Sequence, residues 1–263
     1  MEKRIIYGIN PVREAISAGK QIELILVSRK RQNGAGSGTG ASGATGAAGK
    51  IITEAKEKGI RIETIEANEL KKKTGTEKHQ GLAAVMAKGF IYSQIEEIIT
   101  AWKNSNECAF ILILDSIEDP QNMGTLIRSA EALGVHGIII PKDRSTSVTA
   151  TVTKASAGAT EHTLIHMATN INNAIKKLKD EGVWIVGLTG ESKESITEAD
   201  LNMDIALVIG SEAKGIRRLV KENCDRCLSI PMFGKIGSLN AAQAGTIALY
   251  EARKQRAERN SNE

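Results

Sequence analysis

From Cys108 onward, short apolar runs alternate with amphipathic stretches, and this pattern limits the possible folds more than any other feature of the chain. Helical stretches such as GTLIRSAEALG (124–134) and INNAIKKLKDEG (171–182) fall between several of the runs. Fully apolar runs of four to seven residues are typical of strands buried on both faces. The pattern therefore predicts an α/β fold with a parallel sheet and helices on both faces. The predicted strands are AFILILD (109–115), GIIIP (137–141), VWIVGLT (183–189), IALVIG (205–210) and CLSIPM (227–232).

A dinucleotide-binding fold is the default interpretation of such an alternation, but its signature is missing. The stretch GSEAKG (210–215) lacks the glycine spacing of a Rossmann turn, and the chain contains no P-loop sequence. The missing signatures argue against a dinucleotide or a P-loop nucleotide as the ligand of this sheet.

The residues before this alternation read as a smaller α/β module, residues 1–87. A helix is expected after GINPV, with Asn10 as its N-cap and Pro11 at its first position. A strand (22–28), a short helix ending at Gly59, and two further strands (61–65 and 81–87) should follow. We expect a linker helix within 88–107 and the second domain over 108–263.

Every residue from Gly34 to Gly49 is Gly, Ala, Ser or Thr. Such side chains cannot bury enough area to offset the backbone entropy lost on ordering, so this tract is predicted to be flexible. It resembles an artificial spacer more than an evolved loop.

Composition narrows the class of protein. Hydrophobic residues make up 41% of the chain but aromatic residues only 3%, which predicts aliphatic cores and no extensive surface for base stacking. The longest apolar run is too short to cross a bilayer, and no apolar run follows the charged start to act as a signal peptide. We therefore expect a protein of the cytoplasm.

The three cysteines, Cys108, Cys224 and Cys227, are expected to be free thiols. Cys224 and Cys227 have the spacing of a zinc or redox pair, but no second ligand pair and no nearby histidine accompany them. A metal or redox role is the less favoured interpretation, and we expect no metal.

Charge is unevenly distributed along the chain. Residues 1–88 hold 16 Lys and Arg against 9 Asp and Glu, a net charge of +7, and the remainder holds 19 against 22, a net charge of −3. Basic clusters at 28–32 and 71–81 would attract a polyanion. The alternative is that they are simply solvated loops.

Three loops that follow predicted strands combine tight backbone with a few polar side chains. In an open α/β sheet, ligands bind beyond the carboxyl ends of the strands. The first loop carries Asn122 and leads to Arg128, the second carries Glu212, and the third carries Ser238 and Asn240. Each has a simpler explanation: the two asparagines could be helix caps, Arg128 a surface residue, and Glu212 a complement to a helix dipole.

Taken together and in order, these loops resemble a known family. ILDSIEDPQNMGTLIRSAEALGVHGII, LVIGSEAKGIRRLV and LSIPMFGKIGSLN resemble the three motifs of the TrmH/SpoU branch of the SPOUT methyltransferases, and STSVTATVTKASAGATEH (145–162) also resembles that branch. YGINPVREAI and TGTEKHQGLAAV resemble the substrate-binding domain of RlmB-type 23S ribosomal RNA (guanosine-2′-O) methyltransferases.

The resemblance implies a SPOUT fold with a carboxyl-terminal trefoil knot, preceded by a ribosomal-protein-L30e-like RNA-binding domain. It implies transfer of methyl from S-adenosyl-L-methionine to a ribose 2′-hydroxyl of structured RNA, by a homodimer. By the same resemblance, backbone groups at Gly210, Ile230 and Leu239 hold the cofactor. The polar site residues implied in this way are Asn122, Arg128, Glu212, Ser238 and Asn240.

A guanidinium stays protonated, so we expect Arg128 to anchor a phosphate and to stabilise charge on the attacking oxygen, with Glu212 and Asn122 holding the arginine and the ribose. Two positions depart from the family pattern. Ala242 stands where a hydroxyl residue is usual, and Ala213 stands where glycine is usual. These departures leave open a catalytically impaired or engineered RNA-binding protein, and a transfer RNA target also remains open.

Overall fold

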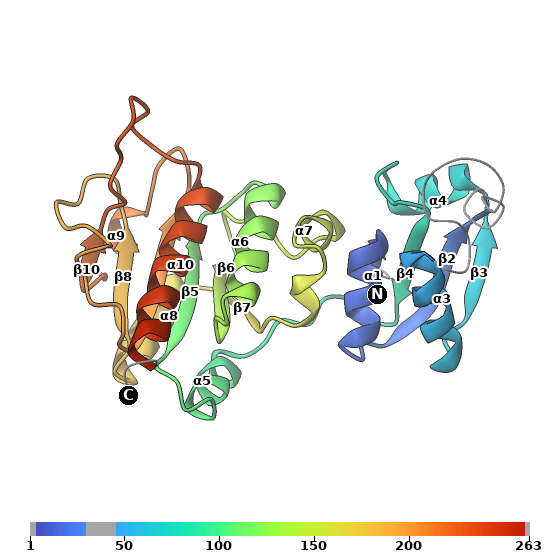
Figure 1. Ribbon diagram of the computed structural model, residues 1–263, viewed down its shortest axis with the longest axis horizontal. Helices are drawn as coiled ribbons and strands as arrows, with labels where there is room; N and C mark the ends of the chain where they lie inside the picture. Colours follow the sequence, from blue (N-terminus) through green and yellow to red (C-terminus); the bar gives the residue numbers. More distant parts are fainter. Residues whose placement is uncertain (1–3, 30–45, 261–263) are drawn as a thin grey trace. The chain divides into compact units, whose positions relative to one another are not determined.

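The computed structural model describes residues 4–29 and 46–260 and divides the chain into two compact units (Figure 1). Unit 1 comprises Met1–Ile91 together with Val148–His162, and unit 2 comprises Tyr92–Ser147 together with Thr163–Glu263. Each unit is described by itself below.

Unit 2 is built on a six-stranded sheet in which every neighbouring pair of strands is parallel, in the order β10-β8-β9-β5-β6-β7. This confirms the parallel α/β fold predicted from the apolar runs. The strand β7 was not predicted, since its His166 and Met167 interrupt the apolar pattern. The strands are β5 (Phe110–Asp115), β6 (Gly137–Pro141), β7 (Ile165–Ala168), β8 (Trp184–Leu188), β9 (Ile205–Gly210) and β10 (Arg226–Leu228).

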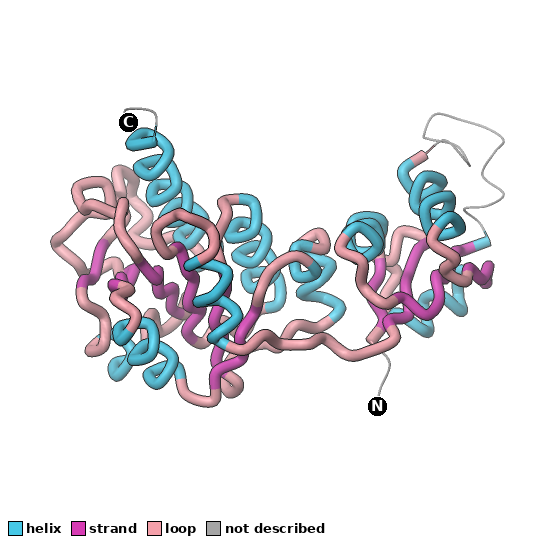
Figure 2. The backbone as a smooth tube through the Cα atoms, turned by 90° about the horizontal axis from the view of Figure 1, so that it is seen from below, coloured by secondary structure: helices cyan, strands magenta, loops and turns pink. Residues whose placement is uncertain are grey.

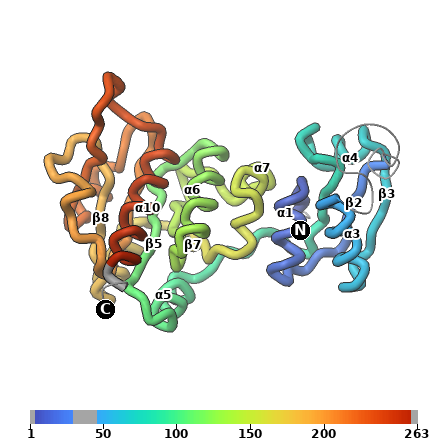
Figure 3. Tube along the Cα trace, viewed as in Figure 1, coloured from blue at the N-terminus to red at the C-terminus, as the bar shows by residue number. Residues whose placement is uncertain are grey.

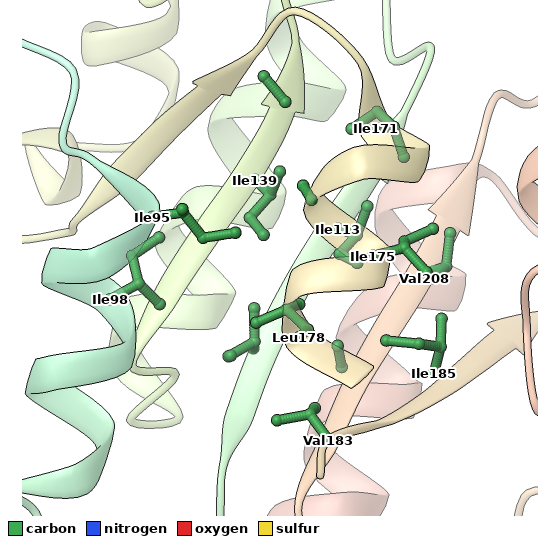
Figure 4. Close-up of a cluster of buried hydrophobic side chains, with 14 of the residues drawn as sticks. Ile95, Ile98, Ile113, Ile139, Ile171, Ile175, Leu178, Val183, Ile185 and Val208 are labelled. Atoms are coloured by element: carbon green, nitrogen blue, oxygen red, sulfur yellow. The ribbon is translucent and has the colours of Figure 1, made fainter. Parts of the chain in front are cut away.

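Helices cover both faces of this sheet (Figures 1 and 2). The helices α5 (Ile95–Lys103) and α8 (Ile171–Asp180) bury aliphatic side chains against one face, where Ile98, Ile139 and Leu178 are fully enclosed (Figure 4). The helices α6 (Pro120–Ala132) and α10 (Ala241–Asn260) lie on the other face. A short helix, α9 (Arg218–Lys221), follows β9, and no described helix is long and apolar enough to cross a membrane.

The pair α6 and α10 packs closely because α10 is rich in small residues. A Cβ on Gly245 would lie 2.4 Å from Leu126 Cδ2, so any larger residue would require the Leu126 side chain to move, and glycine lets the two helices pack closely as they stand. Ser129 and Thr246 join the helices through a 2.8 Å hydrogen bond between their hydroxyls. This packing brings the start of α10 beside the start of α6, although their first residues lie far apart in sequence.

The far end of α10 is fixed by a buried arginine. The Arg256 guanidinium donates to the carbonyl oxygens of Cys108 (2.8 Å), Ala109 (2.8 Å) and Met203 (2.7 Å) and lies 4.6 Å from the Phe110 ring centre. Burial lowers the pKa of Arg256. These contacts tie the last helix to the segments that lead into β5 and β9.

Unit 1 contains a four-stranded mixed sheet in the order β1-β4-β2-β3, with only β2 and β3 parallel. The predicted strands are confirmed, whereas β1 and α4 were not predicted. The prediction that Asn10 caps the first helix is wrong, because α1 starts at Ile9 and its N-cap is Gly8, which has φ 98°. The elements are β1 (Ile5–Tyr7), α1 (Ile9–Ser17), β2 (Ile22–Ser28), α3 (Ala47–Glu57), β3 (Ile62–Ile65), α4 (Ala67–Thr74) and β4 (Leu82–Met86).

The prediction for the Gly/Ala/Ser/Thr tract fails at its end. Residues 34–45 lie outside the described residues, but α3 already begins at Ala47, and Ala48 is buried. Alanine is the strongest helix former, and a small side chain fits where α3 packs on α1. Residues 47–49 therefore belong to a packed helix.

The predicted domain 108–263 is interrupted, because residues 148–162 pack with unit 1. This segment holds α7 (Ala150–Ala155) and a 3₁₀ turn (Ala159–Glu161). Glu161, whose side chain is 1% exposed, pairs with Arg4 at 2.6 Å, and Arg4 also donates to Thr153 Oγ1 at 2.9 Å. A buried carboxylate requires such a partner, and the sequence offers no sign of which cation supplies it.

Candidate functional site

A pocket of about 420 Å³ lies in unit 2 at the edge of the sheet where the strands end. Its walls come from the segments that follow β8, β9 and β10 and from the first residues of α10, and Figure 3 lets these segments be followed along the chain. This volume is within the range of small-molecule sites. The lining includes Leu188, Thr189, Glu191, Gly210, Ser211, Glu212, Lys214, Gly215, Lys221, Ile230, Met232, Gly237, Ser238 and Leu239.

All three residues predicted to hold a cofactor, Gly210, Ile230 and Leu239, line this pocket. A Cβ on Gly210 would lie 2.1 Å from the carbonyl carbon of Gly215, so no larger residue fits there without moving backbone. The loop folds back on itself through two hydrogen bonds between the backbones of Ser211 and Gly215, at 2.8 and 3.1 Å. Glycine therefore allows the backbone to form this wall.

A buried carboxylate fixes the far end of the same loop. Asp115 ends β5 with no exposure, and it accepts the Arg217 backbone N–H at 2.8 Å and the Arg217 Nε–H at 2.7 Å. This pair was not predicted from sequence. An acidic residue that ends an otherwise apolar strand was the available signal, because a carboxylate buried there needs a cation.

The structure brings together three of the predicted polar residues, from the first turn of α6, the loop after β9 and the residue before α10. Asn240 Nδ2 donates to Asn122 Oδ1 at 2.9 Å and lies 3.4 Å from Glu212 Oε2. Asn240 also caps α10, since its Oδ1 accepts the Ala242 N–H at 2.8 Å. The capping interpretation of Asn240 is thus correct but incomplete.

The capping interpretation of Asn122 is wrong. Asp119 caps α6 by accepting the Asn122 backbone N–H at 2.9 Å. The Asn122 side chain is therefore left to meet Asn240, at the point where the starts of α6 and α10 adjoin.

The other two predicted polar residues form no hydrogen bond with this cluster among the described residues. Ser238 lines the pocket on the loop before α10. Arg128 is exposed on α6 and forms no ion pair with any described residue. A phosphate or a carboxylate from outside the described chain can reach its guanidinium.

The two departures from the family pattern are structurally tolerated. Ala213 does not have a positive φ, so its methyl group causes no strain in the loop. Ala242 is buried in the first turn of α10, and its carbonyl accepts the Thr246 hydroxyl at 2.8 Å.

Polar groups on the β8 side of the pocket were not predicted. Thr189 Oγ1 is buried and has no hydrogen-bond partner among the described residues, and Glu191 pairs with Lys221 at 2.8 Å. Lys221 holds the pKa of Glu191 below its usual value. These groups, together with the glycine-formed backbone wall, suit a polar organic ligand with apolar parts.

The cysteine pair is half-buried beside β8. Cys224 Sγ and Cys227 Sγ would lie 3.0 and 3.4 Å from a Cβ placed on Gly187. Burial, and then the neighbouring Cys227, raise the pKa of the Cys224 thiol to about 12, which makes it a poor nucleophile. All three cysteines are free, and the described residues contain no group of three or more His, Cys, Asp or Glu that could hold a metal ion.

Comparison with protein families gives two matches. The SpoU rRNA methylase family matches residues 109–250, and the family of RNA 2′-O ribose methyltransferase substrate-binding domains matches residues 5–89. The two matches together take in the pocket and the unit 1 sheet.

Similar proteins carry consistent names. YacO of Bacillus subtilis, named as a TrmH family tRNA/rRNA methyltransferase, is 42% identical over 211 residues, 80% of this chain and 84% of the relative. A protein of the same description from Staphylococcus saprophyticus is 37% identical over 97% of both chains.

Solved structures share the fold at lower identity. The SpoU methyltransferase AviRb from Streptomyces viridochromogenes, in complex with AdoMet, is similar with a TM-score of 0.77 at 22% identity, over 97% of this chain and 91% of the other. An AdoMet-bound rRNA methyltransferase from Sinorhizobium meliloti is similar with a TM-score of 0.74, also at 22% identity, over 96% and 87% of the two chains.

Proposed function

Because the chain belongs to the SpoU rRNA methylase family, we propose that it transfers the methyl group of S-adenosylmethionine to the 2′-hydroxyl of a guanosine in 23S ribosomal RNA. Activity as an RNA methyltransferase of the TrmH/SpoU type follows from the family itself. The observation that carries the proposal is the pocket at the carboxyl edge of the sheet, where the segments after β8, β9 and β10 meet beside the Asn122–Asn240–Glu212 cluster.

The residues of the pocket fit the cofactor of this family. S-adenosylmethionine supplies a methyl group on a sulfonium, which is open to attack by an oxygen nucleophile. Gly210, Ile230 and Leu239 line the walls, where the family resemblance implies that their backbone groups hold the cofactor, and the orphaned Thr189 hydroxyl offers a further hydrogen bond. Backbone donors and acceptors hold a ligand at fixed positions with little entropy lost on binding.

The polar cluster would orient the ribose at the pocket mouth. The Asn240 amide is fixed from one side by the helix start that it caps and from the other by Asn122. Glu212, which lines the pocket, is left with carboxylate oxygens able to accept a hydrogen bond from a ribose hydroxyl.

In this proposal Arg128 is an anchor rather than a base. Its guanidinium is always protonated, so it cannot take the hydroxyl proton. It can hold the neighbouring phosphate in a bidentate contact and stabilise negative charge that builds on the attacking oxygen. The exposed position of Arg128, without an ion pair to the described residues, leaves the guanidinium available for that contact.

Unit 1 is proposed to hold the RNA. It matches the substrate-binding family over residues 5–89, and residues 1–88 carry the net charge of +7. The resemblance of this module to RlmB-type enzymes is what supports a 23S target.

Three further parts of the proposal come from the family resemblance and from the sequence. They are a homodimer in which Arg128 meets a site completed by the partner, a trefoil knot formed by the segments around the pocket, and a location in the cytoplasm. Size-exclusion chromatography with light scattering tests the first of these.

Two alternatives have specific support. A transfer RNA target is favoured by the names of the relatives, which include both tRNA and rRNA. A catalytically silent RNA-binding protein is favoured by Ala242, which lacks the usual hydroxyl.

The decisive experiment is a mass-spectrometric map of ribose methylation in total RNA from cells with and without this chain. We expect one 2′-O-methylguanosine of 23S ribosomal RNA to disappear with the chain. A site lost from transfer RNA would support the first alternative. Calorimetric binding of S-adenosylmethionine with no site lost from any RNA would support the second.

A further inference from the structure

The loop that joins β10 to α10 carries an apolar tip that is open to solvent. Phe233 is 98% exposed and Ile236 is 74% exposed. The other two phenylalanines have partners: Phe110 is buried beneath Arg256, and Phe90 lies 5.0 Å from the Arg4 guanidinium. Met232, which precedes Phe233, is 40% exposed, so the loop carries three exposed apolar side chains within five residues, and a contiguous exposed apolar patch marks an interaction site.

This tip borders the pocket. Met232, next to Phe233 in sequence, lines the pocket, and so do Gly237 and Ser238 beyond the tip. A Cβ added to Gly234 or Gly237 would meet no atom within 4 Å, so the loop stands clear of the rest of the unit. Figure 1 shows the loop, in red-orange, rising beyond the edge of the sheet where α10 begins.

The pocket that the tip borders is lined by charges of both signs, including Glu212 and Lys214, but the charge carried by the tip itself is positive and favours an anionic partner there. Lys235 lies within the tip, and Lys214 lines the pocket from the loop after β9. Neither lysine forms an ion pair with a described residue. A second copy of this chain docking symmetrically through the tip would bring Lys235 towards its own counterpart, which like-charge repulsion opposes.

We propose that Phe233 stacks on a nucleobase of the bound RNA beside the ribose that is methylated, while Lys235 contacts an adjacent phosphate. The inference rests on the proposed function, since that function brings an RNA nucleotide to this pocket. Unpaired bases of RNA stack on aromatic side chains, and every base has a π-face, so the contact holds the strand without selecting the base. Phe233 is thus a positioning residue that strengthens RNA binding at the pocket mouth.

The first test compares three substitutions in the full chain: Phe233→Ala, Phe233→Leu and Phe233→Trp. For ribosomal RNA, Phe233→Ala should raise KM about tenfold to a hundredfold with a smaller change in kcat. Phe233→Leu should be nearly as impaired, because leucine is apolar but has no π-face, and Phe233→Trp should restore KM. The affinity for S-adenosylhomocysteine should not change in any of the three.

Two results of this test would overturn the proposal. One is a normal KM for Phe233→Leu, which would mean simple apolar contact. The other is a loss of S-adenosylhomocysteine affinity in Phe233→Ala, which would mean that the tip packs on the cofactor. Leu219→Ala is the matched control, because Leu219 is 53% exposed on α9, outside the loop, and its variant should keep the normal KM.

The second test measures stacking without methyl transfer. A single-stranded RNA heptamer with 2-aminopurine at its centre is titrated with the full chain saturated with S-adenosylhomocysteine. Stacking should quench the fluorescence with the original chain and with Phe233→Trp, but not with Phe233→Ala. Quenching by a chain that methylates no RNA would support this inference while the proposed function fails, and methyl transfer without Phe233-dependent quenching would refute the inference alone.

Sedimentation tests whether a second copy of the chain, rather than RNA, binds the tip. The original chain and Phe233→Ala should sediment identically. A lighter species for Phe233→Ala would show that copies of the chain dock through this tip, against the proposal.

Discussion

The two units differ in the strand arrangement of their sheets and in the features that each sheet carries. Unit 1 has a mixed sheet with antiparallel pairs, and its segment 1–88 carries a net charge of +7. Unit 2 has a fully parallel sheet whose strands all end at one edge, where the pocket and three of the predicted polar residues meet. A parallel sheet brings loops that are distant in sequence to one edge, where their side chains can together form a binding or catalytic site. RNA affinity, in contrast, depends mainly on a surface of positive charge.

The largest expected effect comes from a change in unit 2 that strongly lowers methyl transfer but leaves cofactor binding intact. Arg128→Lys keeps the charge but loses the planar fork, so it should be nearly as damaging as Arg128→Ala. Both should lower the rate of methyl transfer by about two orders of magnitude, comparable to the loss of one oxyanion donor. Transfer of tritiated methyl to ribosomal RNA and calorimetric affinity for S-adenosylmethionine, measured side by side, provide the test.

Cofactor affinity should survive in both Arg128 variants, since the predicted cofactor contacts are backbone groups of other residues. An active Arg128→Ala chain would contradict the assigned role. So would one that fails only because it no longer binds S-adenosylmethionine.

The next test asks whether the loop geometry of unit 2 depends on the Asp115–Arg217 pair. Asp115→Asn should lower the free energy of unfolding by about 2 kcal/mol, because it leaves a guanidinium without its buried counter-ion, although Arg217 is partly open to water. It should also weaken S-adenosylmethionine binding, since Arg217 ends the loop that forms the pocket wall. Urea unfolding and calorimetry measure the two effects.

Asp225→Asn is the matched control. Asp225 accepts the Ile185 backbone N–H at 2.8 Å at the start of β8 and pairs with Lys179, so its loss should destabilise unit 2 from the opposite edge of the sheet. If both variants weaken cofactor binding equally, the loop is not specifically held by Asp115.

A smaller effect should follow from removing charge in unit 1. Changing Lys71, Lys72 and Lys73 of α4 to alanine should weaken RNA binding about tenfold and lower the salt dependence by roughly one unit of log–log slope for each phosphate that is no longer neutralised. The matched control changes Lys176, Lys177 and Lys179 of α8 in unit 2, which removes the same charge. Equal losses of affinity in the two triple variants, measured by filter binding at several salt concentrations, would mean that unit 1 has no special role in RNA binding.

The smallest effect concerns pH, and each unit offers a probe. Burial lowers the pKa of His79 in unit 1 and of His136 in unit 2, and each ring nitrogen Nδ1 accepts a backbone N–H, from Gly81 and Phe110 respectively. The unfolded chain therefore takes up these protons first as the pH falls below about 6.5, the ordinary histidine value, so stability should fall with falling pH in that range.

His79→Asn and His136→Asn should each flatten this pH dependence, as followed by urea unfolding from about one unit above to about one and a half units below the ordinary histidine value of 6.5. A variant whose stability falls as steeply as that of the original chain would show that the other groups carry the acid sensitivity.

The sequence by itself determined the fold class and part of the pocket lining, but not the β8 side of the pocket, where Thr189, Glu191 and Lys221 lie. The apolar runs specified β5, β6, β8 and β9, because a strand buried on both faces must be largely apolar, whereas only the last two residues of β10 overlap the predicted strand 227–232.

The resemblance of the ordered motifs to the family predicted Gly210, Ile230 and Leu239 as cofactor residues, and all three line the pocket. The prediction from sequence failed where the signal is weak: β7 is interrupted by His166, and the Ala-rich end of the 34–49 tract is the start of α3.

Only the tertiary structure decided which distant residues meet. The Asn240–Asn122 contact, the Asp115–Arg217 pair and the Arg4–Glu161 pair each join residues more than 100 positions apart. No local pattern encodes such partners, because they depend on strand order and on helix packing, here on the close approach of α6 and α10 that Gly245 permits. The same packing decided that Asn240 is both a helix cap and a member of the polar cluster, while Asn122 is free to meet it because Asp119 caps α6 instead.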